Sequence, residues 1–262
     1  MQSLIWPEGT ERVLDSLSKE PLIKDYVFVG GSALSYHIKH RLSEDIDLFN
    51  ALPALENENI NNIVNNMAKK GYYIEDIGVP FSETHRKFLV IGIKVEFVAS
   101  GRDFLKDENT NLRNNLKIAN IDTVAGMKAF TLTQRKEIRD YYDNYVITER
   151  FGLEFPIKEA KKLYGGQFNE KAFLSTLITG DKIFKEDYIE ERLSPIIKIS
   201  KEEMCSFFKI RVKEHLKNTL SHEQDLSEKQ ESNIKPKSET LKSDAFSQDI
   251  QNRQEHKIKF KR

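Results

Sequence analysis

VGGSALSYHIKHRLSEDIDLFN, residues 29–50, is the stretch of sequence that says most about the fold. Just upstream, Tyr26–Val29 is a short β-branched and aromatic run that indicates a buried strand ending in a tight turn at Gly30-Gly31. Helical sequence begins at Ser32, which is placed to cap it. The run from Asp45 to Phe49 has the composition of a second strand. The stretch therefore predicts a strand, a glycine turn, a helix and a second strand.

The glycine turn has the properties of an anion-binding loop. Gly30 and Gly31 let backbone N–H groups approach an anion because neither carries a Cβ. The helix that follows adds unpaired N–H groups and the positive end of its dipole, and the Ser32 hydroxyl can reach a phosphate oxygen. A Gly-Gly-Ser tripeptide is by itself more often a simple turn.

The second strand carries a pair of carboxylates. Asp45 and Asp47 point to the same face of an extended segment, with Cα atoms roughly 6.6 Å apart. Two carboxylates would repel each other strongly in a dry site, and a divalent cation relieves that repulsion. Mg²⁺ prefers carboxylates together with substrate phosphates. The alternative is an acidic turn, Ser43–Asp45, that runs into an edge strand.

A third acidic residue follows on a later strand. Glu96 lies in the apolar run Lys94–Val98, where an unpaired carboxylate is costly to bury. It can complete a metal site and accept the proton of an attacking hydroxyl. It can also pair with Lys94 on the same strand face, and the two interpretations are compatible because a lysine can border a phosphate site.

The remaining pattern divides the chain into an α+β part and a helical part. Residues 7–18 and 56–69 are expected to be helices, and 86–91 and 93–98 either a hairpin or one bulged strand around Gly92. From about residue 120 the sequence has helical periodicity. The predicted domains are 1–110, a catalytic domain with a small mixed sheet flanked by helices; 111–220, an α-helical bundle; and 221–262, a mobile polar tail.

Composition excludes several classes of protein. A hydrophobic share of 39% excludes wholesale disorder. The 41 basic and 41 acidic residues balance, so a nucleic-acid site would have to be a local patch. A single cysteine, Cys205, excludes an intramolecular disulfide framework and a cysteine-based zinc site. No signal peptide and no membrane-spanning run of roughly 20 apolar residues is seen, so a cytoplasmic protein is expected.

Other site motifs are absent from the sequence. It has no GxxxxGK[ST], GxGxxG, HExxH or CxxC. His37 and His40 share a helix face, but two histidines without further ligands are more often surface or stacking groups than a metal site. Cys205 is expected in the core rather than as a nucleophile.

Residues 29–50 resemble the signature of the nucleotidyltransferase superfamily with the DNA-polymerase-β-like fold, and more narrowly the AbiEii toxin family of type IV toxin–antitoxin and phage-abortive systems. The resemblance covers about residues 26–145. The first family motif corresponds to Gly31, Ser32, Ser43, Asp45 and Asp47. The second is Lys-x-Asp, and here Lys94-Val95-Glu96 has a longer acid at the third carboxylate.

The third and fourth motifs follow in order. Residues 121–128 match a lysine-bearing helix, in which Lys128 is expected to hold triphosphate charge. Asp140 and Asp143 match Asp-x-x-Asp and lie on one helix face. They are expected either to contact the nucleobase or ribose, or to orient Lys128 or Arg135. For Arg135, Lys136 and Arg139 a solvated charged face is the favoured interpretation.

The resemblance implies an enzyme that transfers a nucleoside monophosphate from an NTP to a hydroxyl. It implies two Mg²⁺ ions held by Asp45, Asp47 and Glu96, and nucleotide binding by Gly30, Gly31, Ser32, Ser43, Lys94, Lys128, Asp140 and Asp143. The implied acceptor is RNA, such as a tRNA 3′ end, or a protein hydroxyl, and an antitoxin protein is the implied partner. The alternatives are a nucleotide-binding or partner-binding module with weak turnover and a small-molecule nucleotidyltransferase with an acidic acceptor pocket.

Overall fold

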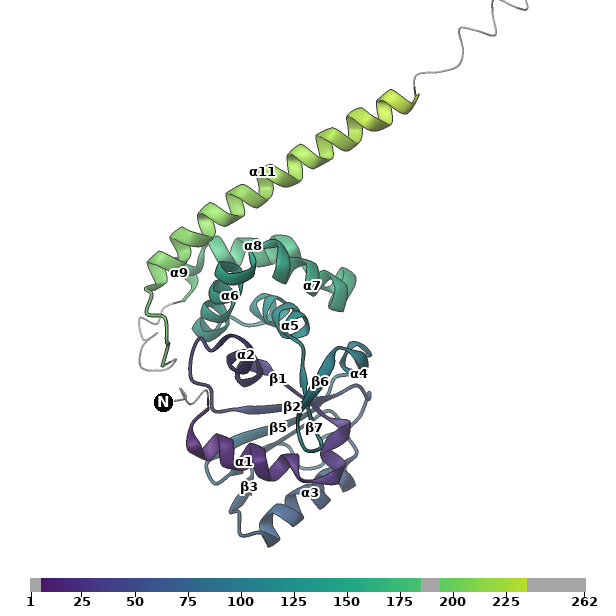
Figure 1. Ribbon diagram of the computed structural model, residues 1–262, viewed down its shortest axis with the longest axis vertical. Helices are drawn as coiled ribbons and strands as arrows, with labels where there is room; N and C mark the ends of the chain where they lie inside the picture. The colour runs from purple at the N-terminus through teal and green to yellow at the C-terminus, as the bar shows by residue number, and fades with distance from the viewer. Residues whose placement is uncertain (1–5, 185–193, 235–262) are drawn as a thin grey trace, which may run out of the picture. The chain divides into compact units, whose positions relative to one another are not determined.

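The computed structural model describes residues 6–184 and 194–234 (Figure 1). In chain order the helices are α1 (Glu8–Ser18), η1 (Pro21–Asp25), α2 (Gly30–Ile38), α3 (Asn57–Lys69), α4 (Phe104–Asp107), α5 (Ile121–Gln134), α6 (Ile138–Phe151), α7 (Glu154–Tyr164), η2 (Gly165–Gln167), α8 (Glu170–Ile178), α9 (Gly180–Ile183) and α11 (Lys201–Ile234). The strands are β1 (Val27–Val29), β2 (Ile46–Asn50), β3 (Ile74–Asp76), β4 (His85–Val90), β5 (Ile93–Ala99), β6 (Asn109–Arg113) and β7 (Leu116–Ala119).

The strands of the described residues form one mixed sheet of seven, in the order β3-β4-β5-β2-β1-β7-β6. β1 pairs antiparallel with β2, and β2 pairs parallel with β5. The short β1, all three of whose residues are buried, therefore stands in the middle of the sheet beside β2. This arrangement confirms the α+β class and the mixed sheet predicted from the sequence.

The segment around Gly92 is a hairpin rather than one bulged strand. β4 and β5 pair antiparallel, with Val90 opposite Ile93, so that Ile91 and Gly92 form a two-residue turn. Both turn residues have positive φ, +47° and +83°, as tight hairpin turns between twisted strands require. The hairpin fixes Glu96 in the middle of β5, next to β2.

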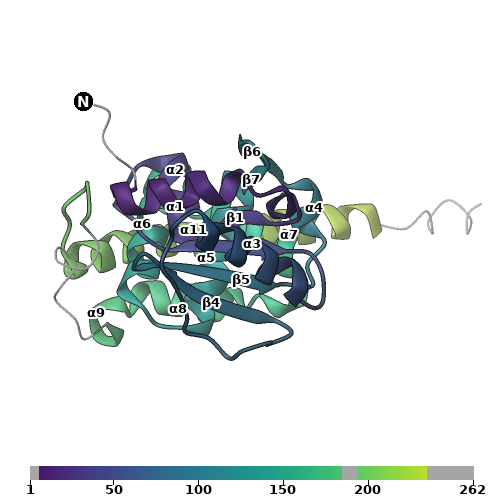
Figure 2. The same cartoon turned by 90° about the horizontal axis from the view of Figure 1, so that it is seen from below.

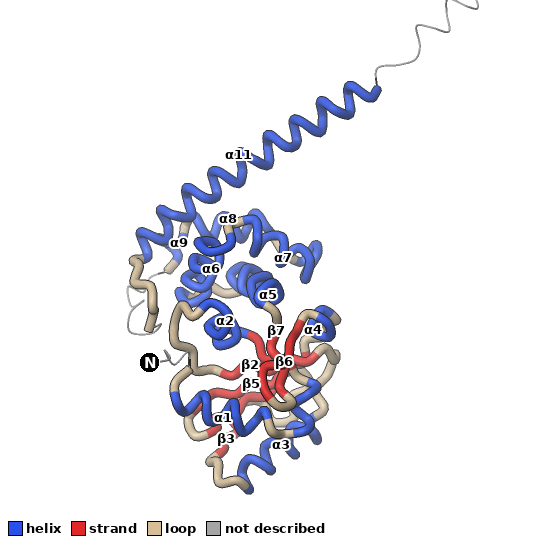
Figure 3. Tube along the Cα trace, viewed as in Figure 1, coloured by secondary structure: helices blue, strands red, loops and turns tan. Residues whose placement is uncertain are grey.

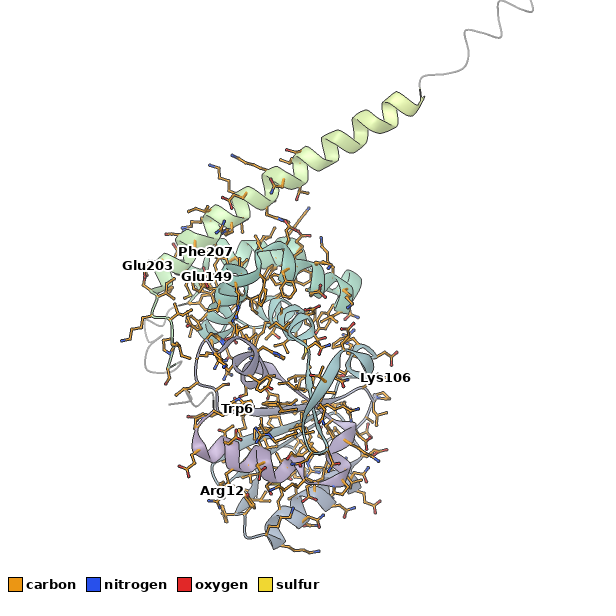
Figure 4. All side chains as sticks on the ribbon, in the orientation of Figure 1. Trp6, Arg12, Lys106, Glu149, Glu203 and Phe207 are labelled. Atoms are coloured by element: carbon orange, nitrogen blue, oxygen red, sulfur yellow. The ribbon has the colours of Figure 1, made fainter. Side chains whose placement is uncertain are left out.

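Helices cover both faces of the sheet (Figures 1 and 2). α1 and α3 lie on one face, where Val13, Leu14 and Leu17 of α1 are buried. α2 and α5 lie on the other face. Trp6 helps to fix α2 because its indole N–H donates to the Ser32 carbonyl at 3.0 Å (Figure 4).

The sheet continues beyond residue 110, where the sequence places the end of the catalytic domain. β6 and β7 extend it to Ala119, and β7 pairs parallel with β1. The helical part then begins at Ile121, and Figure 3 shows α5 to α9 grouped on one side of the sheet. Residues up to Lys213 form one compact unit, and the chain from Glu214 onward is a second. The two predicted parts thus share one compact body.

The predicted tail begins inside a helix. α11 continues to Ile234, past the expected boundary at residue 220, and the rest of the predicted tail lies outside the described residues. No helix in residues 6–184 and 194–234 is both long enough and apolar enough to cross a bilayer.

The contact between α5 and α7 depends on a glycine. A Cβ at Gly126 would come within 2.8 Å of the Glu159 backbone carbon and of a Leu163 methyl group. The backbones of the two helices therefore approach each other closely at this point. Gly126 lies two residues before Lys128, so this packing also sets how far α5 stands from its neighbours.

We expect Gly126→Val to lower the free energy of unfolding by about 1–3 kcal/mol, because α7 must move to make room for the side chain. Urea unfolding followed by circular dichroism measures it. The matched control is Gly166→Val, since a Cβ at Gly166 has no neighbour within 4 Å. Equal stability of the two variants would contradict the close packing.

Candidate active site

A cavity of about 310 Å³ lies between the sheet and the helices of the second half of the chain. Its walls come from β1, β2, β5, the start of α2, and helices α5, α6 and α7. The lining residues are Val29, Gly30, Gly31, Arg41, Ser43, Asp45, Asp47, Phe49, Lys94, Glu96, Val124, Met127, Lys128, Phe130, Thr131, Arg135, Arg139 and Tyr164. Most of the predicted site residues are therefore brought together.

The glycine turn lies against the carboxylate strand. Gly30 has φ +77°, and a Cβ there would lie 2.0 Å from Oδ2 of Asp47. A Cβ on Gly31 would lie 2.4 Å from the Arg41 guanidinium. Both glycines are thus required by close approach, and the first also by its backbone conformation. α2 begins at Gly30, two residues before the predicted start, so both glycines belong to its first turn.

Ser32 is not on the cavity wall. Its side chain is buried and donates to the Asp45 carbonyl, and a 2.8 Å hydrogen bond joins it to the Ser43 hydroxyl. Ser32 therefore connects the first turn of α2 to the loop that precedes β2. Ser43 lines the cavity. The structure thus gives Ser32 a structural role in holding Ser43 and Asp45, where the sequence predicts a direct phosphate contact.

The three predicted carboxylates share one wall. In the parallel pairing of β2 with β5, Asp47 stands opposite Glu96, and Asp45 enters from the loop immediately before β2. Asp47 also stands opposite Val29, the last residue before the glycine turn. The strand register therefore gathers the acidic groups beside the turn, as the sequence predicts.

Basic side chains surround two of these carboxylates. The Lys94 ammonium lies 2.9 Å from Oδ2 of Asp45 and 3.0 Å from Oε1 of Glu96. Nε2 of His85 lies 2.8 Å from the other oxygen of Glu96. Burial alone would raise the pKa of Glu96, but the hydrogen bonds from Lys94 and His85 hold that pKa below its ordinary value. Glu96 is therefore a carboxylate in the folded protein.

Asp47 is in the opposite situation. Burial, together with the charges of Glu96 and Asp45, raises the pKa of Asp47 to about 6. The charges of Lys94 and Lys128 offset this rise only in part, and within the described part of the chain Asp47 has no hydrogen-bond or ion-pair partner. Asp47 is thus a carboxylate beside two like charges that lacks a bound cation of its own.

The donor set suits a divalent cation, although the side chains are not arranged around one. Within residues 6–184 and 194–234, no three His, Cys, Asp or Glu side chains are positioned to hold a metal ion as they lie. The Lys94 ammonium instead lies between two of the carboxylates. Asp47, which has no direct ion-pair partner, nevertheless forms with Asp45 and Glu96 the kind of oxygen-donor set that Mg²⁺ prefers. These residues would fit the ion if Lys94 moved.

Lys128 and the two aspartates of α6 form a buried charged cluster. The Lys128 ammonium lies 3.0 Å from Asp140 and 2.7 Å from Asp143. Both aspartates are fully buried and neither lines the cavity. Asp140 also accepts a 2.8 Å hydrogen bond from Arg135. Of the two roles expected for these aspartates, the structure places them where they orient Lys128 and Arg135.

The cluster extends to a residue that the sequence does not single out. Arg41 follows α2, donates to both oxygens of Asp143 at 2.7 and 3.2 Å, and lines the cavity. His40 is buried, lies 2.7 Å from Asp143, and stacks on Tyr142. In the sequence, His40 and Arg41 look like the basic end of an ordinary helix. What points to a role for Arg41 in the site is its position two residues before Ser43 of the first motif.

Two further arginines line the cavity although a solvated face is the favoured sequence interpretation for them. Arg135 and Arg139 are about half and about two-fifths exposed. Arg139 lies 3.6 Å from Oδ2 of Asp45. Lys136 is exposed and is not on the cavity wall. The start of α6 at Ile138 places Arg139 near Asp45, which helical periodicity alone does not predict.

Apolar side chains also line the cavity. Phe130 of α5 and Tyr164 of α7 stack with ring centroids 3.9 Å apart and planes 9° from parallel. Met127 and Phe49 line the same cavity. The cavity lining thus combines charged side chains with a stacked aromatic pair, which suits a ligand with an anionic part and a flat apolar part.

We expect Asp47→Asn to stabilise the metal-free protein by about 1–3 kcal/mol at pH 8, in chelator, measured by urea unfolding. The folded-state pKa of Asp47 is raised to about 6. Its contribution to stability is therefore complete below the unfolded pKa of about 4, and is lost as the pH rises to about 6. The gain from the substitution should shrink towards pH 4. Asp45→Asn is the control, because Asp45 has Lys94 as a partner; a similar gain there would contradict this explanation.

We expect Asp143→Asn to lower the free energy of unfolding by about 3–5 kcal/mol, because Arg41 and Lys128 would keep buried charges without their shared carboxylate. Asp15→Asn is the control, since its pair with Lys19 is exposed and surface pairs are worth about 0–1 kcal/mol. Chemical denaturation measures both. If the two variants lost the same small amount, the cluster would not stabilise the fold.

Comparison with known proteins places this architecture. The chain is 28% identical over 199 residues to the uncharacterized protein aq_aa25 of Aquifex aeolicus (strain VF5), a match covering 75% of this chain and 91% of that protein. The crystal structure of JHP933 from Helicobacter pylori is similar with a TM-score of 0.53 at 17% identity, covering 85% of this chain and 97% of JHP933. A candidate nucleotidyltransferase from H. pylori has a TM-score of 0.52 at 17% identity, covering 80% and 98%. At these identities the structural matches show the fold.

The family is shown by the sequence itself. Residues 12–242 match the profile of the family described as nucleotidyl transferase AbiEii toxin, type IV TA system. That range contains the sheet, the cavity and the helices that close it. The chain therefore belongs to the AbiEii nucleotidyltransferase toxin family of type IV toxin–antitoxin systems, and it is a nucleotidyltransferase.

Proposed function

We propose that this nucleotidyltransferase transfers a nucleoside monophosphate from an NTP to a hydroxyl group in the cavity between the sheet and α5–α7. The observation that supports this most is the composition of the cavity wall. Three carboxylates adjoin a glycine turn, and basic side chains and the stacked pair Phe130 and Tyr164 line the same cavity. An NTP needs both kinds of surface, a polar end for the triphosphate and an apolar one for the base.

The triphosphate would lie beside the basic side chains of the cavity lining. Five cavity residues are basic, Arg41, Lys94, Lys128, Arg135 and Arg139, against three acidic ones. The backbone N–H groups of Gly30 and Gly31 begin α2 and add the positive end of its dipole. The base would lie against Phe130 and Tyr164. This placement leaves the α-phosphate near the carboxylates.

Asp45, Asp47 and Glu96 would hold the two Mg²⁺ ions expected for this chemistry. Bound there, the ions would neutralise negative charge on the phosphates and stabilise the charge that develops during transfer. The departure from the family pattern, a glutamate at position 96, keeps the carboxylate in the register opposite Asp47. Its extra methylene lets it reach His85 and Lys94 together.

In the proposed reaction the acceptor oxygen forms a bond to the α-phosphorus. The bond from that phosphorus to the bridging oxygen breaks, and pyrophosphate leaves with the electron pair. Glu96 accepts the proton of the acceptor hydroxyl, since it is held as a carboxylate. Arg41 and Lys128, fixed by Asp143, would stabilise the phosphate charge without reorganising.

The acceptor that fits best is an anionic or neutral macromolecule, namely RNA such as a tRNA 3′ end, or a protein hydroxyl. Arg135 and Arg139 border the cavity and are partly exposed, so they could contact an acceptor phosphate. A small cationic acceptor would need an acidic pocket, and the cavity has more basic than acidic groups. As a toxin, the protein would act under the control of a partner antitoxin.

We expect Asp45→Ala and Asp47→Ala each to reduce transfer of label from an α-labelled NTP by at least about 10²-fold, because charge stabilisation is the main catalytic effect. Labelled NTPs are incubated with total cellular extract and Mg²⁺. Nuclease and protease digestion of the product then distinguish an RNA acceptor from a protein acceptor. Circular dichroism checks that the variants are folded, and Asp15→Ala is the control. Full activity in either variant would refute the metal assignment.

A further inference from the structure

Lys94 occupies an unusual position among the carboxylates. Its ammonium contacts Asp45 at 2.9 Å and Glu96 at 3.0 Å, so it uses one oxygen of each of two proposed metal ligands. Lys94 and Glu96 are two residues apart on β5 and share a face of the strand. The spacing of Lys94 and Glu96 along β5 therefore favours this contact. Asp47, which has no direct ion-pair partner, lies opposite Glu96 on β2.

An ammonium and a divalent cation compete for these oxygens. Each is a cation that needs close contact with the same two groups, and their charges repel each other. Resting on the function proposed above, we propose that Lys94 is an internal counter-ion: it holds Asp45 and Glu96 until nucleotide and metal bind together, and it keeps the metal affinity of the free enzyme low.

Lys94 is able to leave this position. Its side chain is 31% exposed and flexible, and it lines the same cavity as the arginines. A bound triphosphate would offer its ammonium an alternative partner. Lys128 differs, because it is only 7% exposed and is fixed by two fully buried aspartates. Of the two lysines on the cavity wall, Lys94 is therefore the one that can exchange partners.

The exchange has a thermodynamic consequence. If the NTP draws Lys94 away, the carboxylates lose their counter-ion as the metal arrives, so nucleotide raises metal affinity. By linkage, metal must raise nucleotide affinity by the same factor. The free enzyme would then hold little metal, and the carboxylates would stay paired rather than repel one another.

The test is Mn²⁺ binding measured by calorimetry, with and without a non-hydrolysable NTP analogue. For Lys94→Met we expect about tenfold tighter Mn²⁺ binding without nucleotide, because the competing ion pairs are gone, and a smaller increase when the analogue is added. Lys94→Arg keeps the charge and should bind Mn²⁺ as the wild type does. Lys87→Met is the matched control, since Lys87 approaches Glu96 only at 3.8 Å and should change Mn²⁺ affinity little.

The outcomes separate this role from the proposed function. Unchanged Mn²⁺ affinity in Lys94→Met, while Asp45→Asn abolishes binding, would overturn the counter-ion role and leave the metal site standing. If Asp45→Asn and Glu96→Gln bind Mn²⁺ with the analogue as tightly as the wild type, the metal assignment fails, and the counter-ion role with it. Thermal unfolding in chelator checks that each variant folds, and Lys94→Gln replaces Lys94→Met should the latter not fold.

Discussion

The repulsion among three carboxylates is the constraint on which the rest of the site depends. The parallel register of β2 and β5 sets Asp47 opposite Glu96, and the loop before β2 brings in Asp45. The fold cannot relax this repulsion without losing the register, which is fixed by buried neighbours such as Ile46 and Leu48. It is met instead by Lys94 on one side and by a raised pKa at Asp47 on the other. The three carboxylates thus lower the stability of the folded protein at the place where the proposed reaction requires negative charge.

The second charged cluster has the opposite character. Asp143 is fully buried, and His40, Arg41 and Lys128 surround it. Burial would raise the pKa of Asp143, yet the cations beside it hold that pKa well below its ordinary value. Because each cation is tied to a carboxylate outside the cavity, the groups that face the cavity are pre-oriented. The cavity thus has one charged cluster that is rigid and another, around Lys94, that can exchange partners.

Features of the site that depend on neighbouring residues in the sequence could be predicted. The strand–glycine–helix–strand run and the same-face spacing of Asp45 and Asp47 are properties of neighbouring residues, so Gly30 and the carboxylate wall could be predicted. Arg41 and Arg139 could not, because their roles arise only when α6 packs beside the loop after α2. Nor could the burial of Ser32, whose hydroxyl is used by Ser43 and Asp45. The extension of the sheet to Ala119 could not be predicted either, because β6 is mostly polar and β7 is only four residues long.

The glutamate at position 96 follows from the same balance of charge. A shorter acid on β5 would place its carboxylate nearer the strand, whereas Glu96 extends far enough to contact Lys94 through one oxygen and His85 through the other. Those contacts keep Glu96 ionised beside Asp47, and burial together with the charge of Glu96 raises the pKa of Asp47. The longer side chain and the nearby lysine therefore belong to one arrangement. Lys94 and His85 of the β4–β5 hairpin contact Asp45 and Glu96. Asp47 has no such partner and is left to interact with a bound ligand.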